Sequence, residues 1–312
     1  MKEQTTKDWL QKLGYKDDDL NALNVIHVAG TKGKGSTCSY IDGFLGQHGA
    51  RTGFPKSRGL YTSPYLQKPN EMIRINNKPI SDEYFRQNFF EVWDRLGLRR
   101  DDTGPPRQLQ LLFILSIHIF IKERVDVAII ETHHGGEFDV TNVIPSPVIT
   151  AITSIGRDHL QELGGTIENI AWHKAGIIKA GSQALSVRQE PAVIRVLKQR
   201  GRDRNVNVRV VESSDQLPGH FQDASQVINA SLAKEVCDEF LRDKVSSCLA
   251  PQDLEAGIRG FSLSGRLQVV QKHDVTWCLD GAHNPMSVEV AARWFRGILE
   301  ANGYVARSDG LS

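Results

Sequence analysis

Short apolar runs alternate with segments of helical periodicity along most of the chain. The runs that predict buried strands are Asn24–Ala29, Val125–Ile130, Val148–Ile152, Gln183–Val187 and Val206–Val211. The segments with helical spacing are Lys34–His48, Gln108–Lys122, Ile167–Ile178, Glu190–Arg200 and Gln226–Leu241. Strands that alternate with helices pair in parallel and are covered on both faces. This order therefore predicts an α/β fold with a mainly parallel sheet and helices on both faces.

Two segments interrupt this alternation, and near Gly260 it starts again. Phe54–Lys78 is rich in Gly, Pro, Ser and Asn, which predicts a large functional loop, and Gly97–Pro106 predicts a surface turn. The elements expected beyond Gly260 are two strands and a helix, at Gly265–Val270, Val275–Leu279 and Ser287–Leu299. We predict a first domain over residues 1–260 and the start of a second, Rossmann-like α/β domain over residues 261–312.

The net charge of the chain bears on which classes of partner it binds. The chain has 312 residues with a formal net charge of +1, and 24% of its residues are charged. Such a near-neutral chain gives no argument for nucleic acid or for a membrane surface, so anion binding must come from local geometry. The longest apolar run, Leu109–Ile121, is too short and too polar to cross a bilayer.

The cysteines and the first residues indicate the compartment. Cys38, Cys237, Cys248 and Cys278 are far apart and form no C-x-x-C pair. This spacing fits buried thiols in a reducing compartment better than disulfides or a zinc site. Residues 1–14 are polar and lack the apolar core of a signal peptide. We therefore expect a cytoplasmic protein.

The clearest chemical signal is the segment Gly30–Ser36, GTKGKGS, which follows a predicted strand and precedes a predicted helix. Its glycines let backbone N–H groups turn inward, and the helix N-terminus adds partial positive charge. Lys34 can reach outer phosphates, and Ser36 or Thr37 can offer a hydroxyl to magnesium. Gly35, between the lysine and the serine, departs from the common G-x-x-x-x-G-K-[ST] pattern. The alternative is a glycine-rich helix start without a ligand, for which this many glycines are costly.

At His27–Thr37, HVAGTKGKGST, the sequence resembles the folylpolyglutamate synthases of the Mur ligase superfamily. Further segments similar to the family follow in the same order, at Tyr61–Leu66, Ile73–Ile80, Val125–Val143, Gly156–His159, Ile170–Ile178, Gln226–Ala230, Ser264–Arg266 and Asp280–Pro285. The resemblance covers nearly the whole chain. Lys32 makes the loop more similar to eukaryotic, fungal-like members than to dihydrofolate synthases.

The resemblance implies an ADP-forming ligase with ATP-binding Mur ligase-like residues 1–260 and a truncated glutamate-ligase domain over 261–312. ATP phosphorylates the γ-carboxylate of a tetrahydrofolate (poly)glutamate, and the amine of L-glutamate then attacks the acyl phosphate. The implied partners are folate, L-glutamate and ATP, with Mg²⁺ as cofactor; K⁺ is also compatible. A monomer without nucleic acid or membrane partners is expected, and the family includes mitochondrial forms.

The resemblance also implies roles for individual residues. Nucleotide contacts are implied for Gly30, Thr31, Lys32, Gly33, Lys34, Gly35, Ser36, Thr37, Asn229, Arg266 and Asp280. The implied metal ligands are Ser36, Glu131 and His159, and the implied catalytic groups are Lys34, Lys174 and His283. Ser63 belongs to the loop expected to close over the folate.

Several of these residues have a structural alternative. Lys174 matches a lysine that is carbamylated in the superfamily; the alternative is an ordinary lysine at a helix start, in a surface salt bridge. The structural alternative for Asp280 is a simple turn after a strand. The alternative for Ser63 is a proline-containing surface turn. A lone Glu131 or His159 is more often a solvated or hydrogen-bonded side chain than a metal ligand.

Some residues depart from the family's pattern. His133 and His134 replace small residues after the glutamate, and two histidines beside a carboxylate raise the alternative of a transition-metal site. Gly135-Gly136 lets the backbone pass near phosphates or metal, or simply ends a strand. The departures near the loop, the pterin and the adenine are Tyr65, Arg107, Gln108 and Ser225.

Three competing functions remain open from the sequence. A dihydrofolate synthase would use the same site on dihydropteroate. A catalytically inactive nucleotide-binding fragment is the alternative suggested by the incomplete second domain. A generic P-loop hydrolase would release phosphate without glutamate, but the segment Asp280–Pro285, DGAHNP, argues against it.

Overall fold

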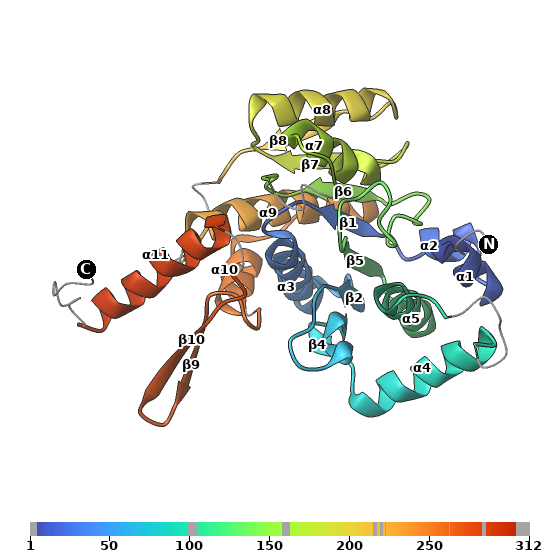
Figure 1. Ribbon diagram of the computed structural model, residues 1–312, viewed down its shortest axis with the longest axis horizontal. Coiled ribbons are helices and arrows are strands. Elements are labelled where there is room, and N and C mark those ends of the chain that lie inside the picture. The colour runs from blue at the N-terminus through green and yellow to red at the C-terminus, as the bar shows by residue number, and fades with distance from the viewer. Residues whose placement is uncertain are drawn as a thin grey trace.

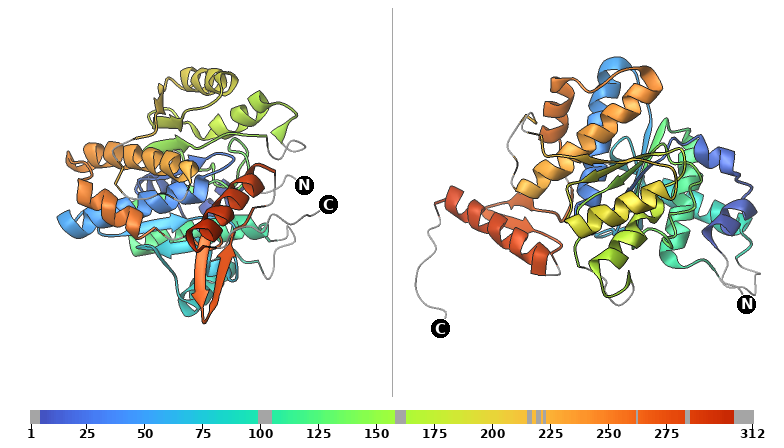
Figure 2. Two further views of the ribbon diagram at one scale, coloured as in Figure 1. Left: turned by 90° about the vertical axis from the view of Figure 1, so that its left-hand side faces the viewer. Right: turned by 90° about the horizontal axis from the view of Figure 1, so that it is seen from above.

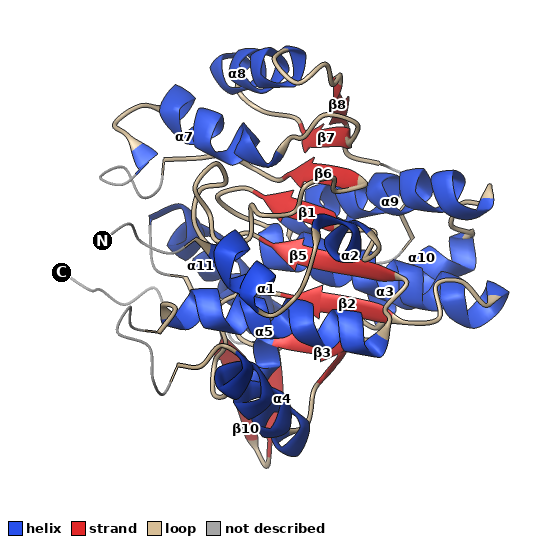
Figure 3. Ribbon diagram, turned by 90° about the vertical axis from the view of Figure 1, so that its right-hand side faces the viewer, coloured by secondary structure: helices blue, strands red, loops and turns tan. Residues whose placement is uncertain are grey.

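The structure is a computed structural model that describes residues 5–98, 105–157, 163–214, 217–218, 221, 223–261, 263–282 and 285–303. Its centre is an eight-stranded sheet in the order β4-β3-β2-β5-β1-β6-β7-β8, seen from one side in Figure 3. The strands are β1 Ile26–Ala29, β2 Arg58–Tyr61, β3 Ile73–Ile75, β4 Lys78–Pro79, β5 Val127–Glu131, β6 Ile149–Ile152, β7 Gln183–Val187 and β8 Val208–Val211. The six strands from β2 to β8 in this order are parallel, and β3 and β4 add an antiparallel edge.

Helices cover both faces of this sheet. They are α1 Thr6–Lys12, α2 Asp17–Asn21, α3 Lys34–Thr52, α4 Asp82–Arg95, α5 Gln108–Glu123, α7 Ile167–Lys174, α8 Pro191–Arg202, α9 Ala224–Val245 and α10 Pro251–Arg259. Helices α3, α9 and α10 pack on one face, to the left of the sheet in Figure 1. On the other face, α1, α2, α4 and α5 cover the half around β2 and β5, and α7 and α8 cover the half around β6 and β7.

The strands explain why both faces are covered. Along β1, Ile26 and Val28 point into the core under α3, whereas Ala29 points into the core under α7 and α8. All four residues of β1 are buried. A parallel sheet buried on both faces needs such continuous apolar strands. The predicted fold class, an α/β fold with a mainly parallel sheet, is therefore confirmed.

The prediction of one large loop over Phe54–Lys78 is wrong. This segment contains β2, the 3₁₀ turn η1 (Pro69–Met72), β3 and β4. Gly59 contributed to the loop prediction, but it lies in β2. The position requires glycine because a Cβ there would come within 2.7 Å of the Phe120 ring. Here glycine marks close packing against α5 rather than a turn. The helices α1, α2, α4 and α10 were also not predicted, and most of Gly97–Pro106 lies outside the described residues.

A two-stranded antiparallel hairpin and a helix follow α10. The hairpin pairs β9 (Gln268–Lys272) with β10 (Val275–Leu279), and α11 covers Pro285–Ala301. The hairpin projects away from the large sheet in Figures 1 and 2. The first strand begins three residues later than predicted because Arg266 N–H closes a turn by donating to the Leu263 carbonyl. The division of the chain into domains at residue 260 stays a prediction.

In the part of the chain that the structure describes, no helix combines the length and the apolar character needed to cross a membrane.

A buried ion pair joins α3 to β2, and its contribution to the free energy of unfolding can be tested. Arg58 Nε donates to Asp42 Oδ1 at 2.9 Å, and both residues are buried. Arg58→Met would leave the Asp42 carboxylate buried without its cation, which typically costs about 3–5 kcal/mol. We expect urea unfolding to show a loss of that size. The matched control is Arg86→Ala, which breaks an exposed pair with Glu83 and is expected to cost less than about 0.5 kcal/mol. Equal losses in the two variants would contradict this prediction.

Candidate functional site

The candidate site lies at the carboxyl ends of β1, β5 and β6, where open parallel sheets place their ligands. Strand β1 lies between the other two, and its Val28 pairs with Glu131 on one side and Ala151 on the other. The loop after β1, Glu131 at the end of β5 and Ser154 after β6 therefore meet at one edge. The prediction that Glu131 ends a strand is confirmed.

The segment Gly30–Gly33 forms a tight turn between β1 and α3. The N–H groups of Thr31 and Lys32 donate to the Ser154 carbonyl at 2.9 and 3.1 Å. The Thr31 hydroxyl donates to the Gly156 carbonyl and accepts from the Gly156 N–H, both at 3.1 Å. These bonds hold the turn against the segment after β6. The free N–H groups for an anion are thus those of the first turn of α3, which have no carbonyl partner within the helix.

Two glycines of the turn are required by close approach. A Cβ on Gly30 would lie 1.8 Å from the Thr153 hydroxyl oxygen. Gly33 has φ 86°, and a Cβ there would lie 2.2 Å from Asn229 Oδ1. Asn229 therefore lies on α9 directly against the glycine that starts α3, beside the turn for which the sequence predicts a nucleotide.

Two ammonium groups converge on one carbonyl oxygen of the turn. Lys34 Nζ donates to Gly30 O at 3.1 Å, and Lys174 Nζ donates to the same oxygen at 2.8 Å. Lys34 Nζ also lies 4.0 Å from Glu131 Oε1. Cations held this close repel each other, and negative charge nearby relieves that repulsion. The arrangement favours an anionic ligand.

The position of Lys174 corrects one alternative for this residue. Lys174 is the last residue of α7, not the first, and it is only 4% exposed. Ile170, one turn earlier on the same face, is buried in the core, so the helical repeat turns Lys174 inward as well. The alternative of a helix-start lysine in a surface salt bridge is wrong. Carbamylation of Lys174 stays a prediction.

Glu131 is buried at the centre of the site. Its Oε2 accepts a hydrogen bond from Ser63 N–H at 3.0 Å, which places the loop after β2 directly over the carboxylate. Burial raises the pKa of Glu131, and the Lys34 ammonium, the Ser63 N–H and Arg266 oppose this rise only in part. A carboxylate that is poorly neutralised when buried attracts a cation.

The residues present fit a hard divalent cation. Mg²⁺ prefers oxygen ligands, and here a carboxylate on Glu131 lies near the hydroxyl-bearing first turn of α3 that contains Ser36. Gly35 leaves room beside the carboxylate, since a Cβ there would lie 3.4 Å from Glu131 Oε2. Among the described residues, no group of three or more His, Cys, Asp or Glu side chains is placed to hold a metal. His159, the third predicted ligand, lies outside the described residues.

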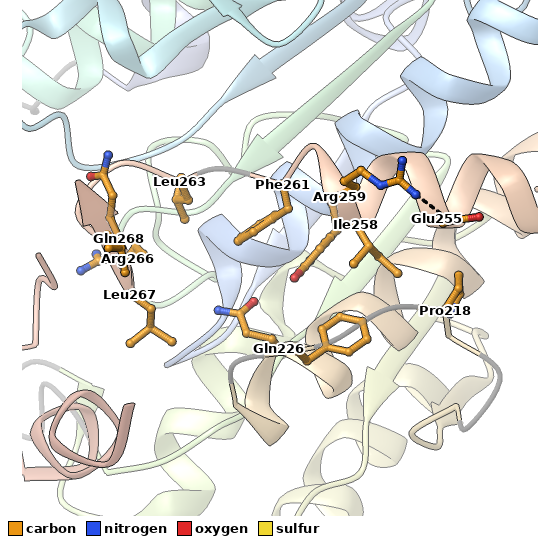
Figure 4. A pocket seen from close by; sticks show the side chains of 13 residues that line it. Pro218, Gln226, Glu255, Ile258, Arg259, Phe261, Leu263, Arg266, Leu267 and Gln268 are labelled. Atoms are coloured by element: carbon orange, nitrogen blue, oxygen red, sulfur yellow. Dashed lines mark hydrogen bonds and ion pairs between the residues drawn. The ribbon is translucent and has the colours of Figure 1, made fainter. Parts of the chain in front are cut away.

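A cavity of about 560 Å³ opens next to the turn, between α3, α9, α10 and the start of β9 (Figure 4). Tyr40 forms one wall, with its ring stacked on Phe261 at 4.1 Å between ring centres. Gln226 also lines the cavity (Figure 4), and its buried Oε1 has no hydrogen-bond partner among the described residues. Leu263 connects the cavity to the turn, because it lies 3.6 Å from a Cβ built on Gly35. The lining combines aromatic rings with a buried polar atom, as small-molecule sites commonly do.

Arg266 and Asp280 lie together at the base of the hairpin. Asp280 Oδ2 accepts from Leu267 N–H at 2.8 Å, and the Gly281 N–H donates to the Gly265 carbonyl at 2.8 Å. Asp280 thus closes a turn, as its structural alternative proposes, and a nucleotide contact for it stays a prediction. Arg266 lines the cavity, and its charge lowers the pKa of Glu131. His283 lies outside the described residues.

The sequence did not reveal a contact between Tyr61, at the end of β2, and His133, two residues after Glu131. The Tyr61 hydroxyl lies 2.7 Å from His133 Nε2, and the two rings meet edge-on at 5.4 Å. Burial lowers the pKa of His133, with Asp139 opposing the change. The only signal was the departure at His133, because Tyr61 is distant in sequence and joins it through the pairing of β2 with β5. Two other departures also meet, since Gln108 Nε2 donates to the Tyr65 hydroxyl at 3.2 Å.

The chain is similar to proteins named folylpolyglutamate synthase. It is 41% identical over 302 residues to the one from Neurospora crassa and 42% identical over 301 residues to a probable one from Schizosaccharomyces pombe. Each match covers 92% of this chain but 57% and 59% of the relative, so the chain spans little more than half the length of these curated relatives. No protein-family model matches the chain.

Solved structures support the same relationship. The apo form of L. casei FPGS aligns with a TM-score of 0.80 at 26% identity, covering 94% of this chain and 75% of that one. A structure described as an FPGS-AMPPCP-folate complex aligns with a TM-score of 0.81 at 26% identity, covering 95% and 76%. The folylpolyglutamate synthase of Mycobacterium tuberculosis complexed with ADP aligns with a TM-score of 0.76 at 27% identity, covering 92% and 69%.

Proposed function

Because this chain is a homologue of the fungal folylpolyglutamate synthases, we propose that it belongs to an ATP-dependent ligase that adds L-glutamate to the γ-carboxylate of tetrahydrofolate (poly)glutamates. The products would be the extended folate, ADP and phosphate. The convergence of Lys34 and Lys174 on Gly30 O is the observation that carries this proposal. Two cations beside a helix N-terminus, the half-buried Lys34 and the buried Lys174, are suited to a triphosphate, whose charge exceeds that of any single side chain.

The turn and the cavity would hold the two ends of ATP. The first-turn N–H groups of α3 and the Lys34 ammonium would bind the β- and γ-phosphates, as in other phosphate loops. The base would enter the cavity between Tyr40 and Gln226, where an amide with an unpartnered Oε1 can accept from an exocyclic amine. Asn229 lies between these two places, against Gly33.

The chemistry requires an activated carboxylate. The γ-phosphoryl group of ATP would pass to an oxygen of the folate carboxylate, and ADP would leave. The amine of glutamate would then attack the carbonyl carbon, release phosphate and lose a proton. Lys34 would offset the charge that develops on the transferred phosphoryl group. Mg²⁺, with Ser36, Glu131 and His159 as its proposed ligands, would supply Lewis-acid stabilisation of the phosphates.

The loop after β2 would lie over the second substrate. Ser63 N–H is bonded to Glu131, so the loop begins at the proposed metal ligand and runs toward the hairpin. Leu66 in this loop would be 2.9 Å from a Cβ on Gly265, which shows direct contact between the two segments. A folate carboxylate that enters between them would meet the γ-phosphate at the carboxyl ends of β1 and β5.

The proposal is tested by glutamate-dependent phosphate release. The purified chain is given Mg-ATP and either a reduced folate or dihydropteroate, with and without L-glutamate, and the product is analysed by mass spectrometry. We expect phosphate release only with glutamate, together with a folate longer by one glutamate. Product from dihydropteroate instead would identify a dihydrofolate synthase. Release without glutamate would indicate a hydrolase, and stabilisation by ATP without any release an inactive nucleotide-binding chain.

A further inference from the structure

We propose that the outer face of α8 is a docking surface for an acidic helical segment of a partner protein. Three exposed cations, Arg195, Lys198 and Arg202, lie on this face, and two exposed aromatic side chains, Phe138 and Trp172, lie beside it. Helix α8 is at the top of Figure 1, next to α7. None of these residues lines the cavity beside the turn that joins β1 to α3, so the inference goes beyond the proposed function and does not rest on it.

Positive charge is concentrated in and around α8. Residues 188–209 contain seven Lys or Arg and two Asp or Glu, which gives this segment a net charge of +5. The whole chain has a net charge of +1, so its other residues together carry −4. Part of the positive charge is neutralised within the protein, since Arg200 pairs with Glu137, and Arg209 pairs with Glu235 and Glu239. The cations on the outer face are the ones left over.

These outer cations have no acidic partner in the part of the chain that the structure describes. Arg195 and Lys198 form no ion pair or hydrogen bond there, and Arg202 donates to the Gln199 side chain at 2.5 Å. Lys198 lies three residues after Arg195 and four before Arg202, so the three side chains are neighbours on one stripe of the helix. Like charges at this spacing destabilise a helix, and carboxylates placed opposite them would relieve the repulsion.

Apolar side chains flank the cationic stripe on both sides. An open surface pocket of about 520 Å³ contains the stripe together with Ile194, Ala192 and Val196. At 3.6 residues per turn, Ile194 lies on one side of the stripe, and Ala192 and Val196 lie on the other. All three are half-buried. A partner that fits this pocket therefore needs apolar side chains as well as carboxylates.

An aromatic pair lies on the α7 side of the pocket. Glu168 of α7 lines the pocket, and Trp172 follows it by one helical turn on the same face. Arg200 of α8 covers one side of the Trp172 ring, with Cζ 4.4 Å from the ring centre. Phe138 lies beside Trp172 with 6.4 Å between ring centres, and 79% of Phe138 is exposed. Aromatic rings and arginines are the residues enriched where proteins bind each other.

A protein helix fits this surface better than a nucleic acid does. The stripe from Arg195 to Arg202 covers about 10 Å along the helix axis, which is about two turns of a partner helix. Carboxylates three or four residues apart on such a helix would face the cations, and an apolar side chain would reach Phe138. A nucleic-acid strand instead stacks its bases on open aromatic rings along a longer cationic groove. Here Arg200 already covers one face of Trp172.

The test uses a peptide that the protein itself selects. A phage library of random peptides of about 12 residues, or about three helical turns, is selected on the immobilised wild-type chain. The most enriched peptide is synthesised with a fluorescent label, and its binding is measured by fluorescence anisotropy. We expect enriched sequences in which Asp or Glu residues recur every three or four positions and alternate with apolar residues.

Charge reversal on α8 should then weaken binding of the selected peptide. In the triple variant Arg195→Glu, Lys198→Glu, Arg202→Glu, attraction becomes repulsion at three contacts, so we expect the dissociation constant to rise about 10–100-fold. The matched control carries Lys56→Glu, Lys78→Glu and Lys272→Glu, which reverse the same number of exposed charges on other elements. It should bind the peptide as the wild type does.

Phe138→Ser tests the apolar part of the surface and leaves every charge in place. We expect it to raise the dissociation constant about 10-fold, as the loss of an aromatic anchor typically does. If the triple variant does not fold, Phe138→Ser decides the question by itself, because this side chain is largely exposed and its loss should leave the fold intact.

Several results would overturn the proposal. They are the absence of enriched peptides, enriched peptides without acidic residues, and wild-type affinity for the peptide in the triple variant or in Phe138→Ser. Tighter binding of a single-stranded RNA or of phosphatidylserine vesicles, lost in the triple variant, would show that the surface serves another class of partner. A dimer seen by analytical ultracentrifugation in the wild type but not in the triple variant would identify a second copy of the chain as the occupant.

Discussion

Replacement of Lys34 by alanine is expected to weaken the binding of a magnesium-loaded ATP analogue by about 10–100-fold, since a hydrogen bond to a charged group contributes about 1.5–3 kcal/mol. Phosphate release should fall further, because the ammonium also offsets charge that develops during transfer. Lys34 lies at the start of α3, with Nζ 3.1 Å from Gly30 O and 4.0 Å from Glu131. Isothermal titration calorimetry with the ATP analogue measures the loss of affinity directly.

The matched control for this prediction is Lys56→Ala. Lys56 is an exposed lysine in the segment between α3 and β2, so its loss changes the net charge by the same amount. Its affinity for the analogue should equal that of the wild type. Equal affinity in Lys34→Ala and Lys56→Ala would remove the assigned role of Lys34 and, with it, the phosphate-binding turn.

Glu131→Gln is expected to raise stability and to lower metal-dependent nucleotide binding at the same time. The pKa of Glu131 is raised in the folded protein, so its ionised form is less favourable there than in the unfolded chain. Above the unfolded pKa, near 4.5, ionised Glu131 therefore costs folding free energy, and below that pH the cost disappears. A neutral glutamine removes the cost, so the variant should melt at a higher temperature than the wild type at pH 7.

The two effects of Glu131→Gln are measured separately. Thermal unfolding without ligands at pH 7 and pH 4 should show a gain for the variant that shrinks at the lower pH. Titration with the ATP analogue, with and without Mg²⁺, should show that the metal no longer improves binding. A variant that is less stable at pH 7, or that keeps the full effect of Mg²⁺, would show that Glu131 is a structural residue.

The parallel strands were the most predictable part of the fold. The bounds of β7 were predicted to the residue, and those of β5 and β6 within two residues at each end. Strands buried on both faces need uninterrupted apolar side chains, and a run such as Val127–Glu131 stands out from its polar surroundings. β2 was missed because its sequence, RGLY, contains a charge and a glycine whose roles depend on Asp42 and Phe120.

The candidate site was predictable as a set of residue types but not as a geometry. The spacing of glycines and lysines in Gly30–Ser36 predicts a turn for anions, and the turn is present. Nothing in the local sequence indicates that Lys174 points inward at the end of a helix, since that depends on how α7 packs under Ile170. The bond between Tyr61 and His133 depends on strand pairing across a long stretch of sequence.

The contact between Asn229 and Gly33 has a mechanical consequence for how a nucleotide would enter and leave. Helix α9 packs along α3 in one core, and Asn229 fills the space at the start of α3, so these two helices behave as one rigid support. Opening must then come from the segments that cover this support, which touch where Leu66 meets Gly265. Widening of the cavity would therefore separate the Leu66 loop from the segment at Gly265 and leave the two helices beneath them in place.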